Sequence, residues 1–122
     1  MTVLSVKQRE VRDITVLDLK GDITWGEGAD TLLITIKRLI ERGTCKILLN
    51  LAEVRYIDSD GLGKLVAVYT SLLRHQCGQL KLLHVNRNLR EILVITKLVT
   101  VFDAYDDETE ALDNYRWEYP YS

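Results

Sequence analysis

The part of the sequence best suited to chemistry is the segment YIDSDGLG at residues 56–63. It places one hydroxyl, Ser59, between two carboxylates, Asp58 and Asp60, with two glycines directly after them. If the segment joins a strand to a helix, Asp58 or Ser59 can accept a hydrogen bond from the first N–H groups of that helix. A helix N-terminus also tolerates a phosphate, and a phosphoryl group on Ser59 would add about −1.5 to −2 charge there. The same residues equally fit an ordinary helix cap in a glycine-containing turn, so residue types alone leave both interpretations open.

The other residue types that carry chemistry are scattered. His75 and His84 are isolated, no Cys/His spacing is typical of zinc, and no glycine-rich nucleotide-binding motif is present. Asp22 and the two carboxylates beside Ser59 can be drawn as an acidic cluster, but no set of base, nucleophile and oxyanion donors accompanies them. We therefore expect a protein that is not an enzyme and that carries no metal and no cofactor.

Composition and charge limit the possible classes of protein. The 122 residues are 47% hydrophobic and 28% charged, which is typical of one globular domain. The net charge of −2 argues against direct binding of nucleic acid. We find neither an apolar run of the ~20 residues that cross a bilayer nor a secretory leader, so we expect a cytoplasmic protein without membrane contact. Accordingly, Cys45 and Cys77 are predicted to be reduced thiols.

The hydrophobic pattern indicates which elements position Ser59. Two β-rich segments, residues 3–9 and 14–20, predict a hairpin. Apolar residues that recur every three and four positions predict helices, and short apolar runs between them predict strands. The helices are expected at 29–40, 62–73, 89–96 and 106–115, and the strands at 45–51, 79–85 and 100–104. The order β-β-α-β-α-β-α-β-α predicts an α/β fold with a mixed, mostly parallel sheet and helices packed on it.

Several segments resemble one known family. DSDGLG at residues 58–63 is similar to the D-S-[ST]-G-[LI]-G signature of STAS domains, the anti-sigma factor antagonists of bacteria. LKGDI at 19–23 resembles the family's hydrophobic-x-G-[DE]-[IL] strand end, and ILLNL at 47–51 resembles its central strand. GQLKL at 78–82 and the C-terminal part of the chain are similar as well. The resemblance implies a STAS domain over residues 1–114, followed by an aromatic C-terminal tail at 115–122.

The resemblance implies a function in transcription regulation by partner switching. A STAS antagonist binds an anti-sigma factor that is also a serine kinase, and so frees the sigma factor. The kinase phosphorylates the motif serine, the complex dissociates, and a phosphoserine phosphatase resets the cycle. By position, Ser59 is the expected phosphorylation site, and Asp58 positions the turn. The expected partner-binding residues are Thr24, Trp25, Asp58, Asp60, Gly61, Leu62, Gly63 and Lys64. The alternative is a STAS scaffold or signalling-complex component that does not cycle.

Two positions depart from the family pattern. Asp60 stands where the family usually has a small hydroxyl or alanine, and its carboxylate could repel the phosphates of ATP, imitate the phosphorylated state or help to hold Mg²⁺. Thr24 stands where an aspartate is common, and it could be a second hydroxyl acceptor or simply a turn or capping residue. Both departures bear on phosphorylation rather than on the fold.

Aromatic residues outside this pattern allow further hypotheses. Trp25 follows the second predicted strand, where it could anchor a partner or pack within its loop. In the tail, Tyr115 and three further aromatics at 117, 119 and 121 alternate, so an extended segment would place them on one face. Such a strip would pack on the domain or on a second subunit of a homodimer. A frayed terminus is the competing interpretation.

Overall fold

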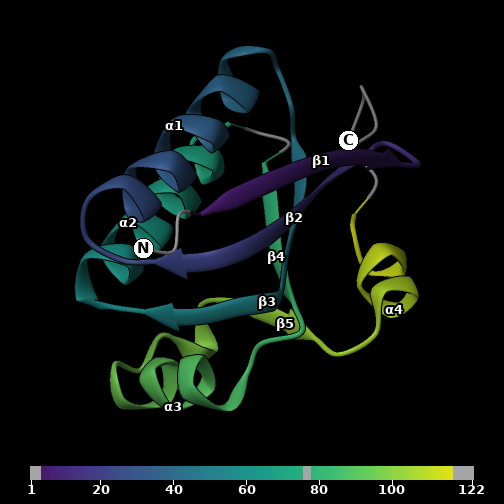
Figure 1. Cartoon of the computed structure of the whole chain (residues 1–122). Helices are drawn as coiled ribbons and strands as arrows, with labels where there is room; N and C mark the ends of the chain where they lie inside the picture. The colour runs from purple at the N-terminus through teal and green to yellow at the C-terminus, as the bar shows by residue number, and fades with distance from the viewer. Residues whose placement is uncertain (1–3, 76–77, 117–122) are drawn as a thin grey trace.

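The computed structural model describes residues 4–75 and 78–116 as a single sheet with helices on both faces (Figure 1). Five strands follow the order β1-β2-β3-β4-β5 across the sheet. The first two strands are antiparallel, and all the others are parallel. The strands are β1 (Ser5–Val11), β2 (Ile14–Ile23), β3 (Lys46–Ile57), β4 (Gln79–Leu83) and β5 (Asp103–Tyr105).

Helices connect the parallel strands in the predicted order. They are α1 (Glu27–Glu41), α2 (Ser59–Leu73), α3 (Arg87–Ile95) and α4 (Glu108–Asp113), and a short 3-10 helix, η1 (Leu98–Thr100), precedes β5. The predicted fold class and element order are therefore confirmed. The bounds differ most at β3, which runs to Ile57 instead of ending at residue 51, and at β5, which begins only after η1.

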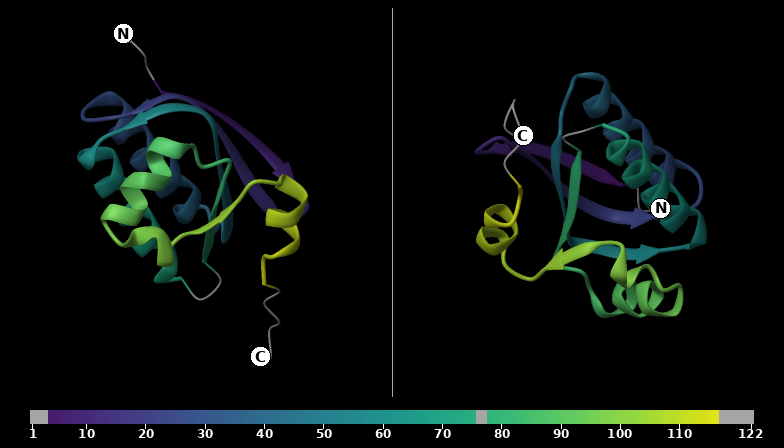
Figure 2. Two further views of the ribbon diagram at one scale, coloured as in Figure 1. Left: turned by 90° about the horizontal axis from the view of Figure 1, so that it is seen from below. Right: turned by 180° about the vertical axis from the view of Figure 1, so that it is seen from behind.

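The helices divide unequally between the two faces of the sheet. Figures 1 and 2 show α1, α2 and α3 on one face and α4 on the other. The larger core lies under the first three helices and includes Leu17, Ile23, Leu49 and Leu65. The smaller core lies under α4 and consists of Ile14, Val16, Leu48, Leu83, Ala111, Leu112 and Tyr115. Because α4 has only six residues, it covers only part of its face.

The long strand β3 reflects this unequal cover. Its first four residues are all buried, since that part of the strand is covered on both faces. Beyond Leu51 only Val54 and Ile57 are buried, and both belong to the larger core. The sequence pattern therefore marks the buried half of the strand clearly. The half that leads to Ser59 is covered on one face only.

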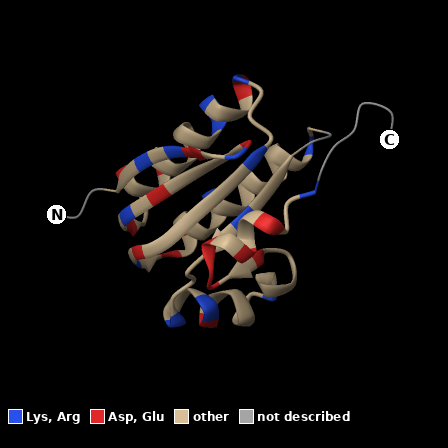
Figure 3. Cartoon of the chain, turned by 90° about the vertical axis from the view of Figure 1, so that its right-hand side faces the viewer, with Lys and Arg blue, Asp and Glu red and all other residues tan. Residues whose placement is uncertain are grey.

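Charged side chains pair extensively around α4. Lys46 and Lys81 are both buried, and their Nζ atoms lie 2.6 Å from Asp13 Oδ2 and 3.0 Å from Asp103 Oδ2. Figure 3, which looks at this side of the molecule, shows basic and acidic residues interspersed over the strands and α4. Buried charges need such partners.

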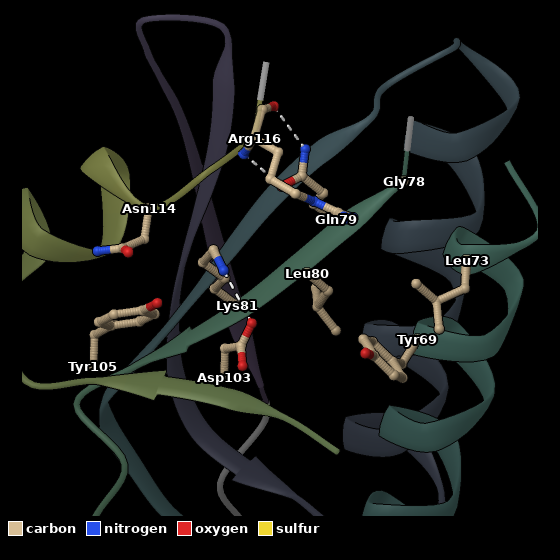
Figure 4. A pocket seen from close by; sticks show the side chains of 10 residues that line it. All are labelled: Tyr69, Leu73, Gly78, Gln79, Leu80, Lys81, Asp103, Tyr105, Asn114 and Arg116. Carbon is tan, nitrogen blue, oxygen red and sulfur yellow. Dashed lines mark hydrogen bonds and ion pairs between the residues drawn. The ribbon is translucent and has the colours of Figure 1, made fainter. Parts of the chain in front are cut away.

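The predicted tail begins inside the domain. Tyr115 is buried, and its hydroxyl donates a hydrogen bond of 2.5 Å to the carbonyl of Ile47. The Gln79 side chain then pairs with both backbone groups of Arg116, accepting from its N–H at 2.8 Å and donating to its carbonyl at 3.0 Å (Figure 4). The remaining aromatic residues of the predicted strip, at 117, 119 and 121, lie outside the described residues.

The cysteine prediction is wrong for Cys45, which is joined in a disulfide instead of being a reduced thiol. Its carbonyl accepts a hydrogen bond of 2.8 Å from the N–H of Gln79. The residue before β3 and the first residue of β4 therefore lie side by side, a proximity that the spacing of cysteines along the sequence does not reveal. The second cysteine, Cys77, lies outside the described residues.

Candidate functional site

Asp58 determines where α2 begins. Its backbone is extended, and its Oδ1 accepts a hydrogen bond of 2.8 Å from the N–H of Gly61 in the first turn of the helix. Its Oδ2 accepts a second hydrogen bond of 2.8 Å from the N–H of Trp25, in the loop that leads to α1. The Gly61 N–H and then the Trp25 N–H lower the pKa of the Asp58 carboxyl below its ordinary value. An ionised Asp58 thus ties the β2–α1 loop to the start of α2.

A close backbone approach fixes the same helix against β2. A Cβ atom on Gly61 would lie 1.8 Å from the carbonyl oxygen of Ile23, so only glycine fits there. Gly28, at the start of α1, approaches the carbonyl of Asp22 in a similar way, with 2.2 Å for a Cβ. Gly63 has no atom within 4 Å of such a Cβ. Of the two motif glycines, Gly61 is required by packing and Gly63 is open to solvent.

Ser59 is the first residue of α2 and is exposed. Within the described part of the chain, no residue forms a hydrogen bond with its hydroxyl. The carboxylate of Asp60 lies 3.8 Å from Nζ of Lys64, one turn further along the helix. The positive end of the helix dipole and the nearby ammonium group both favour an added negative charge at this position.

The other predicted partner-binding residues divide between surface and core. Trp25 is 80% exposed, which excludes a packed loop tryptophan, and its role as a partner anchor stays a prediction. Thr24 is half-buried, and its carbonyl accepts the N–H of Ala29 at 2.9 Å. Leu62 is buried in the larger core, as is the backbone of Gly61. These two residues therefore shape the surface from beneath it.

Sequence reasoning missed the contribution of the last residues of β3. Tyr56 pairs with Asp22 across the sheet and is 59% exposed. The Arg55 guanidinium lies 5.8 Å from the centre of the Tyr56 ring, and its Nε lies 3.7 Å from Oδ1 of Asp22. Asp22 thus faces Arg55 rather than Ser59. The alternation of Val54 and Tyr56 with polar neighbours was the available signal, but we expected the strand to end at residue 51.

The two carboxylates on either side of Ser59 are engaged within the fold, Asp58 by two backbone N–H groups and Asp60 by Lys64. In residues 4–75 and 78–116, no three His, Cys, Asp or Glu side chains gather as metal ligands. The Asp58 carboxylate is engaged by two backbone N–H groups, so it is a helix cap rather than a base for Ser59.

No helix of the described chain is long and apolar enough to cross a membrane.

Comparisons with known proteins identify the family. The STAS domain model matches residues 5–111. The chain is 26% identical over 110 residues to an anti-sigma F factor antagonist of Paenibacillus polymyxa. The aligned region covers 89% of this chain and 92% of that protein. A putative anti-sigma factor antagonist of Thermotoga maritima superposes with a TM-score of 0.81 at 25% identity, over 92% and 95% of the two chains. The Bacillus cell fate determinant SpoIIAA in its phosphorylated form gives a TM-score of 0.69 at 21% identity, over 92% and 100%. The chain belongs to the STAS domain family.

Proposed function

We propose that this STAS domain is an anti-sigma factor antagonist controlled by phosphorylation of Ser59. With Ser59 unmodified, it binds an anti-sigma factor that has serine kinase activity and so frees a sigma factor in the cytoplasm. Phosphorylation of Ser59 releases the partner, and a phosphoserine phosphatase restores binding. The chain is then a substrate and a switch rather than an enzyme. The observation that carries the proposal is the exposed hydroxyl of Ser59 at a helix start whose cap, Asp58, is already formed.

The phosphotransfer step needs nothing from this chain except an accessible hydroxyl. Oγ of Ser59 attacks the γ-phosphorus of ATP held by the kinase, its proton passes to a base of the kinase, and ADP leaves. Because Asp58 caps α2 through its own side chain, the cap does not depend on the Ser59 hydroxyl. The helix therefore retains its first turn when Oγ is esterified.

Release follows from local charge. The phosphoryl group adds about −1.5 to −2 charge beside two carboxylates, on a surface where Lys64 is the neighbouring cation. A partner surface that fits an uncharged serine must then desolvate a dianion or meet like charges, and either costs binding free energy. The relatives named above as anti-sigma factor antagonists, at 25% and 26% identity, support this class of function.

The competing proposal is a STAS scaffold that does not cycle at Ser59. Asp60 favours it, because a permanent carboxylate directly after the acceptor resembles part of the charge that phosphorylation would add. The ion contact of Asp60 with Lys64, at 3.8 Å, offsets that charge only partly.

The test is to incubate the chain with its cognate anti-sigma factor kinase and Mg-ATP and to locate phosphate by mass spectrometry. We expect one phosphate on Ser59, none on the Ser59→Ala variant, and normal modification of a matched Thr24→Ala control. Phosphate on Thr24 alone, or undiminished phosphate on Ser59→Ala, would contradict the switch. Partner binding that Ser59→Asp leaves unchanged would favour the scaffold.

A further inference from the structure

Exposed apolar side chains gather in one segment of the chain that lies outside the DSDGLG motif. Eight large hydrophobic residues of the described chain are exposed, and four of them fall between residues 94 and 101. These four, Val94, Ile95, Val99 and Val101, are between 40% and 80% exposed and are named here the apolar ridge. The ridge spans the end of α3, the 3-10 helix η1 and the residue after it. Exposed apolar side chains concentrated in one short segment are a candidate interaction site, unlike apolar residues that are exposed singly.

The ridge is held rigidly by the residues beneath it. Leu89 and Leu93 anchor α3 in the larger core, and Phe102, directly after the ridge, is buried with its ring 4.9 Å from that of Tyr69 on α2. Asn86 caps α3 and donates a hydrogen bond of 2.8 Å to the carbonyl of Val54 on β3. The four side chains of the apolar ridge therefore stay exposed, because Leu89, Leu93 and Phe102 already occupy the core beneath them.

The ridge lies on the same side of the molecule as the Ser59 turn, and Phe102, directly after it, packs on Tyr69 of α2. The cap of α3 contacts β3 at Val54, four residues before Asp58. Figures 1 and 2 agree that the C-terminal half of α3 lies on the side of the molecule where β3 ends and α2 begins. One partner of ordinary size can therefore cover both, since a stable interface takes about 800 Å² from each protein.

Charge distinguishes the two parts of this face. In the segment 87–101, Arg87 lies 3.3 Å from Glu91, and Arg90 lies 3.8 Å from Asp106. Among the described residues Lys97 has no such ion pair, and it lies between the two halves of the ridge, whereas the Ser59 turn carries Asp58 and Asp60. A partner that covers both is therefore expected to be acidic where it meets Lys97 and uncharged opposite Ser59.

We propose that the apolar ridge is the second contact of the docking surface, and that it binds an apolar patch flanked by acidic residues on the same anti-sigma factor that contacts Ser59. This inference rests on the proposed function and deepens it. Two exposed aromatic residues belong to the Ser59 turn: Trp25, whose N–H binds Asp58, and Tyr56, two residues before Asp58 on β3. Removal of the ridge side chains from water on binding adds affinity through the hydrophobic effect, whereas the Ser59 turn provides control.

The test compares two equal changes at exposed isoleucines. Ile95→Glu places a carboxylate on the ridge, whereas Ile34→Glu places one at a 48% exposed position on α1, which stands apart from α3 in Figure 1. Binding to the recombinant cognate anti-sigma factor kinase is measured by calorimetry. We expect Ile95→Glu to raise Kd at least 30-fold and Ile34→Glu less than 3-fold. Lys97→Glu should lower the association rate several-fold at low salt and much less at high salt.

The remaining outcomes separate this inference from the proposed function. If Ile95→Glu binds within 3-fold of the unmodified chain while Trp25→Ala binds weakly, the ridge is not part of the surface and the proposed function survives. If the unmodified chain neither binds the kinase nor gains phosphate on Ser59, both fall together. Sedimentation of the isolated chain completes the test: a dimer that Ile95→Glu dissociates would assign the ridge to a second copy and overturn the proposal. Circular dichroism of each variant excludes unfolding as the cause.

Discussion

The two faces of the sheet use polar groups in opposite ways. Around α4, charged residues are joined to one another: Arg9 pairs with both Asp18 and Glu108, and Lys81 lies between the rings of Tyr105 and Tyr115 as well as beside Asp103. At the Ser59 turn, one carboxylate binds two backbone N–H groups, and a hydroxyl and an indole remain exposed. Polar side chains that stabilise the fold form their ion pairs and hydrogen bonds with other residues of the same chain. Side chains that are to bind something else must be left without such partners while backbone contacts hold them in place.

The largest loss of stability is expected from a change at the backbone contact between Gly61 and Ile23, beneath Ser59. Gly61→Ala forces a methyl group against the Ile23 carbonyl, and we expect it to lower the free energy of unfolding by about 3 kcal/mol. Gly63→Ala is the matched control, because its methyl group meets no atom within 4 Å and alanine favours the helix, a gain of about 0.5 kcal/mol. Urea denaturation measures both. Equal effects at the two glycines would contradict the close approach.

On the other face, the largest single effect should come from the buried tyrosine. Tyr115→Phe removes the hydroxyl that donates to Ile47 and leaves that carbonyl without this partner, which costs about 1.5 kcal/mol. Burial also raises the pKa of Tyr115, so its phenol should not ionise together with the exposed tyrosines on alkaline titration. Spectrophotometric titration checks this, and the early ionisation of all six tyrosines would contradict the packing of residue 115.

A change at the cap of α2 is expected to lower the stability of the Ser59 turn by less. Asp58→Ala removes the acceptor for two N–H groups and should lower the free energy of unfolding by about 1 kcal/mol. Asp58→Asn retains one acceptor oxygen, so it should lose less stability. Hydrogen exchange at the amides of Gly61 and Trp25 is the decisive measurement. Faster exchange at Gly61 alone would mean that the loop of Trp25 does not depend on this carboxylate.

Acid pH should affect the α4 face through its ion pairs. The Arg9 guanidinium holds the pKa values of Asp18 and Glu108 below their ordinary range. A carboxyl whose pKa is lower in the folded state contributes stability above its unfolded pKa of roughly 4, and the contribution disappears as the pH falls through the folded pKa. Glu108→Gln should therefore lower the Tm slightly at pH 7 and make its decline below pH 4 shallower. Parallel Tm curves for variant and unmodified chain would contradict a role for this pair.

Sequence patterns predicted the fold well because burial is periodic. The helical spacing around Leu65 and the apolar run at residues 47–49 each determine one buried face, and the element order follows. A helix start near Ser59 was likewise predictable, because capping depends on neighbours in the chain, but the sequence left Asp58 and Ser59 both open as the cap and placed the first helical residue at 62 instead of 59. The partners of Arg9 were not, since Glu108 lies 99 positions away. The exposed half of β3 and the apolar ridge were missed because an exposed and a buried valine look alike in a sequence.

The hydrogen bond between Asp58 and the backbone of Trp25 has a practical consequence. It connects the backbone of a residue with an exposed indole to Asp58, which directly precedes the proposed phosphorylation site Ser59. The chain has only two tryptophans, so a Trp117→Phe variant would leave Trp25 as the sole strong fluorophore. Its emission then reports on the charge and solvent exposure around Ser59 in real time. The protein therefore contains its own optical probe, with which the proposed modification of Ser59 and the proposed docking and release of a partner can be tested without an attached dye.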